Sequence, residues 1–366
     1  MIRQIGSAFQ FLKKEKFYSF LFLAVIVFYT SMQFWHGETA KEASKPAPAV
    51  EAFKHAEVRL QNRIQKAGSM NEYLKAHPKF EAVFTLLSIL IGFGLTAGLI
   101  IDFLILFKPG WRARFAYEPK PPPSVDWKFS MIFKVVLLFI AGSTLLGGIL
   151  SGSKRFLGGG AGDMNFYMLF HTFLIDFLSF AFVLHVVRAE GGSQRDIGLQ
   201  VPSGSVPREL IIAWGAYAAI LPLFVLSLVG LIALAQLFHY EPEAHPLVNI
   251  FLEEEHRSSF LIYFSIFLAV AFGPVFEEIF FRGFCYQILK RHWGIFPAMV
   301  ASAAGFALIH ANTFAFWPIF ILGMALAWVF EKRGSLLPGI ILHVTHNAVF
   351  ITYFFLAKKL VQQAGG

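Results

Sequence analysis

The chain has 366 residues, of which 56% are hydrophobic and only 15% are charged. Soluble globular domains carry about 25% charged residues, so this chain has too few charges to cover a soluble surface. The composition therefore indicates an integral membrane protein and excludes disordered and collagen-like chains. A single cysteine, Cys285, excludes an intrachain disulfide. We assign the formal net charge of +8 to contacts with anionic headgroups of the bilayer and expect no nucleic acid partner.

Long apolar runs follow one another along the chain, and a spanning helix needs about 20 such residues. Together they predict an all-α polytopic transmembrane bundle. About nine membrane helices are expected, at 17–35, 82–107, 129–150, 166–187, 210–238, 259–284, 294–310, 314–331 and 335–357. The first run follows Lys13, Lys14 and Lys16 and is too long for a signal peptide, so we expect it to be an anchor.

The segment 36–80 is the one long extramembrane loop that the pattern predicts. Apolar residues recur in it at helical spacing, which favours a surface helix lying on the membrane. Contact with a partner or substrate is the alternative. Short loops rich in Lys and Arg fall on the same side as the N-terminus, so we expect a cytoplasmic N-terminus in a bacterial inner or plasma membrane. The loop 311–313 is assigned to the opposite side.

Ionisable residues at membrane depth are costly, and each is a functional hypothesis. Most of those in the apolar runs fall in the last quarter of the chain. The full set of these residues in the apolar runs is Asp102, Lys134, His171, Asp176, His185, Glu277, Glu278, Arg282, His310, His343 and His346.

The segment 273–283 holds two adjacent glutamates after a Gly-Pro pair, which predicts a helix break followed by a new helix. Glu278 and Arg282 lie four residues apart on one helix face and are expected to pair. Glu277 is rotated by about 100° from Glu278 and lacks this partner, so we expect it to serve as general base. A salt bridge that only fixes helix packing is the alternative.

Two further helices bring candidate donors to a similar depth. Phe306 lies one turn before His310 and is expected to wall one side of a pocket. His343 and Asn347 share a face of the last helix, whereas His346 is assigned a packing role. At about 1.5 Å of rise per residue, these groups can meet in one intramembrane cavity.

This residue set permits peptide hydrolysis without a covalent intermediate. A carboxylate and an imidazole can hold and deprotonate water, and a second imidazole and a carboxamide can donate to the oxyanion. Glu277, His310, His343 and Asn347 supply these groups. The expectation is a metal-free site. A zinc ion held by Glu277, His310 and His343 is the alternative, although the familiar His-Glu-x-x-His spacing is absent.

The pattern Glu277-Glu278-x-x-x-Arg282, Phe306-x-x-x-His310 and His343-x-x-x-Asn347 resembles the three-motif signature of the CPBP family. This family comprises type II CAAX prenyl endopeptidases and bacteriocin-processing, Abi-like proteins. The resemblance extends over 195–357, after N-terminal membrane helices in 1–194 and before a short tail, 358–366.

The resemblance implies a division of labour among these residues. Glu277 and His310 would activate the water, and His343 and Asn347 would form the oxyanion site. The supporting residues would be Glu278, Arg282 and Phe306.

The sequence therefore predicts an intramembrane endopeptidase of glutamate type. Its substrate would be a membrane-associated or lipid-modified protein, such as a CAAX-box protein. Two alternatives remain: a catalytically inactive scaffold or immunity factor that keeps the fold, and an ion- or proton-coupled transporter.

Overall fold

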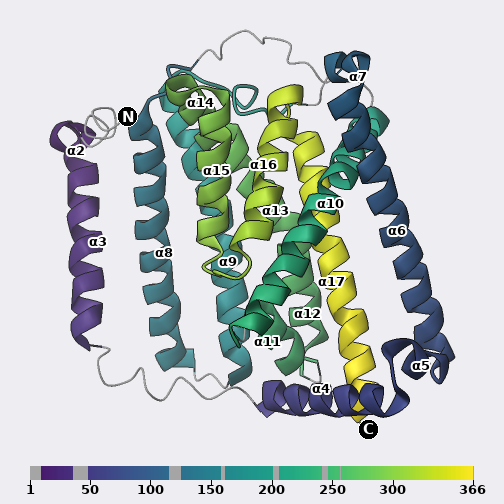
Figure 1. The fold of residues 1–366 in the computed structure, drawn as a ribbon. Coiled ribbons are helices and arrows are strands. Elements are labelled where there is room, and N and C mark those ends of the chain that lie inside the picture. Colours follow the sequence, from purple (N-terminus) through teal and green to yellow (C-terminus); the bar gives the residue numbers. More distant parts are fainter. Residues whose placement is uncertain are drawn as a thin grey trace.

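The computed structural model describes residues 10–35, 48–114, 125–157, 161–200, 206–240, 246–255 and 257–365. Within these ranges the chain is helical and contains no strand (Figure 1). The prediction of an all-α membrane bundle is confirmed. The first part of the predicted loop, 36–47, lies outside the described residues.

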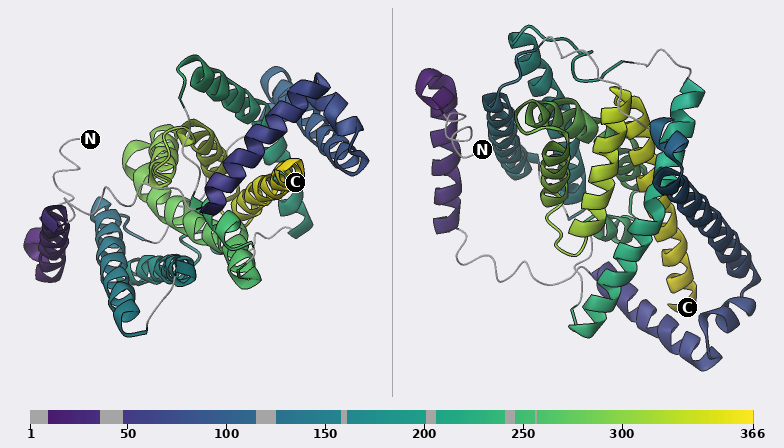
Figure 2. Two further views of the ribbon diagram at one scale, coloured as in Figure 1. Left: turned by 90° about the horizontal axis from the view of Figure 1, so that it is seen from below. Right: turned by 45° about the horizontal axis from the view of Figure 1, so that its top comes forward.

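The long helices run roughly parallel or antiparallel through the bundle, and shorter helices lie at its two ends (Figures 1 and 2). The helices are α2 (Gln10–Lys14), α3 (Lys16–Trp35), α4 (Pro48–Ala67), α5 (Met70–Lys75), α6 (Pro78–Phe107), α7 (Pro109–Arg114), α8 (Phe129–Leu157), α9 (Ala161–Ala189), α10 (Val206–Leu237), α11 (Pro246–Glu253), α12 (Ser259–Phe267), η2 (Leu268–Phe272), α13 (Gly273–Glu278), η3 (Ile279–Tyr286), α14 (Gln287–Trp293), α15 (Ile295–Ile309), α16 (Phe316–Arg333) and α17 (Leu337–Gly365).

Six described helices are long and apolar enough to cross a membrane, so the predicted number of nine is not confirmed. The difference lies partly in α15 and α16. These two helices form a hairpin whose tip stops inside the bundle, well short of the end where α4 lies (Figure 1). The assignment of 311–313 to the opposite membrane face is therefore wrong. With 15 residues, α15 is only about 22 Å long, which is too short to span the hydrocarbon core.

One continuous helical segment, Ser259–Trp293, carries the two glutamates. Its α-helical turns alternate with the wider π-helical turns η2 and η3. The predicted break at Gly273–Pro274 is wrong, because the backbone stays helical there. The Gly273 N–H bonds to the Leu268 carbonyl, five residues back, and this wider turn accommodates a proline that has no N–H.

Helices α6 and α10 cross at two glycines. A Cβ atom built on Gly98 would lie 2.1 Å from the Ala218 carbonyl oxygen, and one on Gly94 would lie 3.0 Å from Leu221. The spacing Gly94-x-x-x-Gly98 lets two backbones approach closely in a membrane. Glycine at these positions therefore fixes how α6 joins the bundle.

Helix α4 lies across one end of the bundle, nearly perpendicular to the spanning helices (Figures 1 and 2). Its buried residues Ala56 and Leu60 pack in a cluster with Leu360 and Val361 of α17. The exposed face is polar. The predicted helix in the loop 36–80 is thus present, and it covers the end of the bundle.

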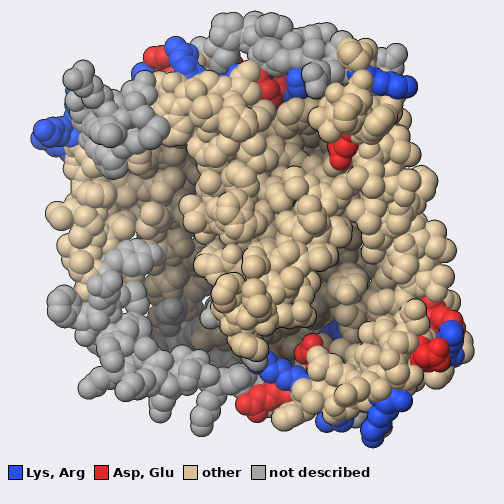
Figure 3. All heavy atoms as spheres, in the orientation of Figure 1, with Lys and Arg blue, Asp and Glu red and all other residues tan. Residues whose placement is uncertain are grey.

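Charged side chains gather at the two ends of the molecule, and the surface between them is nearly uncharged (Figure 3). At one end Lys128 donates a hydrogen bond to Glu190, which joins the start of α8 to the end of α9. This hydrogen bond and the negative charge of Glu190 raise the pKa of Lys128. The uncharged middle matches the hydrocarbon layer of a bilayer.

Candidate active site

Glu278 is buried inside the bundle and accepts hydrogen bonds from two basic side chains. Arg282 Nη1 donates to Glu278 Oε1 at 2.8 Å, and His343 Nδ1 donates to the same oxygen at 3.1 Å. The Glu278 side chain is only 1% exposed. The predicted pairing with Arg282 is present, and it ties α13 and η3 to α17.

Arg282 has two further contacts that hold it in place. Its Nη2 donates to the Gly323 carbonyl of α16 at 3.2 Å. The guanidinium carbon lies 4.4 Å from the centre of the Phe306 ring, which is a cation–π distance. Arg282 therefore links the helical segment Ser259–Trp293 to both arms of the α15–α16 hairpin.

Glu277 has a different environment from its neighbour. Its side chain is 29% exposed, and its Oε2 lies 3.6 Å from His343 Nε2. His343 thus stands between the two glutamates, with Nδ1 on Glu278 and Nε2 toward Glu277. One carboxylate is locked in a buried pair, and the other remains accessible beside an imidazole.

Phe306 joins the two predicted histidines. Its ring lies 4.9 Å from the His310 ring and 5.5 Å from the His343 ring, edge-on to both. His310 Nδ1 donates to the Phe306 carbonyl at 2.8 Å, so in the neutral ring Nε2 carries the lone pair. His310 reaches the cluster through Phe306, at the tip of the α15–α16 hairpin.

Asn347 of α17 donates a hydrogen bond to the helical segment Ser259–Trp293. Its Nδ2 donates to the Ala269 carbonyl at 2.7 Å. In an α-helix this carbonyl would accept from Gly273, but the Gly273 N–H bonds to Leu268. In a π-helix it would accept from residue 274, which is a proline. Asn347 therefore satisfies a carbonyl that the wide turn leaves open, and its amide keeps a second N–H.

His346 packs away from these groups, as expected. Its ring lies edge-on to Tyr217 at 5.8 Å and to Phe224 at 5.0 Å, both from α10.

Asp176 lies on the face of α9 that packs against the helix carrying Glu277, between the ring contacts Phe173–Phe272 and Phe180–Phe276. It appears among the ionisable residues of the apolar runs, but nothing in the local sequence relates it to the three motifs. One local feature could have singled out Asp176. Phe173 lies three residues before it and Phe180 four residues after it, so all three share one face of α9, and the two phenylalanines mark that face as packed.

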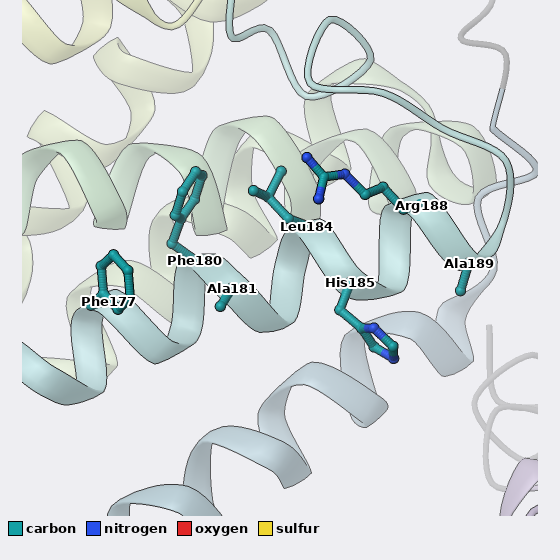
Figure 4. Close-up of a pocket in the computed structure, with 7 residues that line it drawn as sticks. All are labelled: Phe177, Phe180, Ala181, Leu184, His185, Arg188 and Ala189. Atoms are coloured by element: carbon teal, nitrogen blue, oxygen red, sulfur yellow. The ribbon is translucent and has the colours of Figure 1, made fainter.

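A groove of about 520 Å³ lies elsewhere, along the surface of α9 (Figure 4). None of the three motifs contributes to its lining, so it is separate from the glutamate cluster. The described residues that line it are Phe177, Phe180, Ala181, Leu184, His185, Arg188 and Ala189.

A zinc site needs three or four protein side chains grouped around one point. Among the described residues, no three His, Cys, Asp or Glu side chains are grouped so that they could hold a metal ion. Glu277 Oε2 and His343 Nε2 lie 3.6 Å apart. His343 Nδ1 is used by Glu278 and His310 Nδ1 by the Phe306 carbonyl, which leaves Nε2 open on both rings.

All three motifs lie in one segment that matches a family model. Residues 259–349 match the model of the family described as Type II CAAX prenyl endopeptidase Rce1-like. Comparisons with curated proteins and with solved structures give no match. The resemblance to the CPBP family is thereby confirmed, and the segment 259–349 of this integral membrane protein is similar to Rce1-like endopeptidases.

Proposed function

We propose that the chain is an intramembrane endopeptidase that hydrolyses peptide bonds of membrane-associated or lipid-modified proteins. The observation that carries this proposal is the contrast between Glu277 and Glu278. The Glu278 side chain is 1% exposed and held by Arg282, whereas the Glu277 side chain is 29% exposed. A salt bridge that only fixed packing would need one of these carboxylates, not both.

In the proposed reaction, Glu277 accepts a proton from water while the water oxygen attacks the scissile carbonyl carbon. The carbonyl electron pair moves to its oxygen. When the tetrahedral intermediate collapses, the C–N bond breaks and the proton passes from Glu277 to the leaving nitrogen. His310 is the second residue that we assign to this water, and its Nε2 is open because Nδ1 is given to the Phe306 carbonyl.

Two groups are left to stabilise the oxyanion. Asn347 has a second N–H besides the one given to Ala269. His343 acts here as an imidazolium, which carries an N–H on Nε2 besides the Nδ1–H given to Glu278. Both groups are held by these first contacts before substrate arrives. Removing one such preorganised donor typically slows a hydrolase by about 10²–10³-fold.

The test is the variant Glu277→Gln, which keeps the shape of the side chain and removes the base. We expect loss of proteolysis in native membranes at an unchanged melting temperature. Glu57→Gln, on the exposed face of α4, is the matched control and should behave as wild type. Retained proteolysis in Glu277→Gln would refute the assignment of the general base.

A further inference from the structure

Asp176 is a carboxylate at membrane depth that the proposed reaction does not use. Phe173, Asp176 and Phe180 lie three and four residues apart, so they share one face of α9. Phe173 stacks on Phe272 at 4.6 Å, and Phe180 meets Phe276 edge-on at 5.7 Å. These two contacts press this face of α9 against the helix that carries the glutamates.

Asp176 therefore lies between two aromatic contacts and faces the Glu277 side of the interface. Phe276, which Phe180 contacts, is the residue next to Glu277, so Asp176 and Glu277 come from neighbouring turns of this interface. Ionisable residues inside a membrane are rare and usually functional, because burying an uncompensated charge is costly. A packing role between phenylalanines would be served better by an apolar side chain.

Two facing carboxylates repel each other unless a hydrogen lies between them. Water supplies two hydrogens, and each can be accepted by one carboxylate. An oxygen held in this way directs its lone pairs away from both carboxylates, toward an incoming carbonyl carbon.

We propose that Asp176 is a positioning residue of the reaction centre, and that its carboxylate holds the second hydrogen of the water that Glu277 activates. This inference rests on the proposed function. Glu277 takes one hydrogen as a proton, and the oxygen bonds to the carbonyl carbon. Asp176 keeps its hydrogen bond to the other hydrogen, so it gains and loses no proton.

The chain offers a matched control in Asp102, an aspartate of the spanning helix α6, which packs against α10. The experiment compares wild type, Asp176→Asn, Asp176→Glu, Asp102→Asn and Glu277→Gln at equal expression. Two quantities are measured: the rate at which new protein termini appear in native membranes, and the melting temperature of the purified protein.

We expect Asp176→Asn to lower the rate by about a hundredfold, the effect of misplacing a reacting group by about 1 Å. Its melting temperature should stay at or above that of wild type, because an uncompensated charge is removed. Asp176→Glu should regain part of the rate, and Asp102→Asn should match wild type. A merely structural aspartate would not give a loss of rate that the conservative variant restores.

The inference is overturned if termini are lost in Glu277→Gln but persist at the wild-type rate in Asp176→Asn. It is also overturned if Asp176→Asn loses rate only in proportion to a lower melting temperature, or if Asp102→Asn is equally slow. If wild type and Glu277→Gln yield the same termini, the proposed function fails, and this inference fails with it.

Discussion

Glu277 and Glu278 are neighbours in the chain, yet the helix turns their side chains toward different surroundings. The spacing of Glu278 and Arg282 allowed their pairing to be predicted from the sequence, since residues four apart share a helix face. The position of His343 between both glutamates could not be predicted. That contact depends on how α17 packs against α13, which local spacing does not determine.

Removal of Arg282 should be far more harmful than removal of the whole pair. Arg282→Ala leaves Glu278 buried without its cation, which typically costs about 3–5 kcal/mol. We expect a lower melting temperature and no proteolysis.

The double variant Glu278→Gln with Arg282→Met is the control, because replacing both partners of a buried pair by neutral groups is much less costly. It should recover most of the melting temperature. An Arg282→Ala protein as stable as wild type would show that the pair does not hold this part of the fold.

At the scale of single elements, the wide turn at Pro274 explains why Asn347 is placed where it is. Asn347→Ala should leave the Ala269 carbonyl without its donor, at a cost of about 1–3 kcal/mol. Pro274→Ala restores a backbone N–H to the helix next to this carbonyl. The cost of Asn347→Ala should therefore be smaller in the Pro274→Ala background.

Thermal unfolding of the two single variants and the double variant measures this coupling. Pro222 lies inside α10, so Pro222→Ala combined with Asn347→Ala provides an additive control. Additivity in both pairs would mean that Asn347 does not compensate for Pro274.

The glycine crossing of α6 and α10 gives a second prediction for an element. Gly98→Ala introduces a Cβ atom that would lie 2.1 Å from the Ala218 carbonyl oxygen, so α6 must move away. We expect destabilisation of about 1–3 kcal/mol, as for an overpacked core. Gly92→Ala, on the same helix, has no atom within 4 Å and should leave the melting temperature unchanged. Equal effects of the two variants would contradict this account of the crossing.

The α15–α16 hairpin shows the limit of reading elements from apolar runs. Hydropathy locates both helices but does not distinguish two full crossings from a hairpin that enters and returns on one side. Length carried the missing information, since 15 residues are too few for α15 to span the bilayer.

At the scale of the whole molecule, composition was enough to predict a membrane-embedded helical bundle, and motif spacing was enough to predict the three-helix site. The match to the Rce1-like family model spans residues 259–349. Outside it, α9 packs against the helix that carries Glu277 and brings Asp176 to that interface, and α4 covers one end of the bundle. Local spacing predicted the helix in 36–80 and marks an apolar face of α9. What these two helices pack against depends on tertiary contacts between segments far apart in sequence, which local spacing does not determine.

The most direct test of the central claim compares protein N- and C-termini in native membranes that contain either wild-type protein or Glu277→Gln at matched levels. We predict that a set of termini present with wild type is absent with the variant, and these termini would also identify the substrate and the cleavage site. Identical sets of termini under several growth conditions would contradict the claim that this chain is a protease.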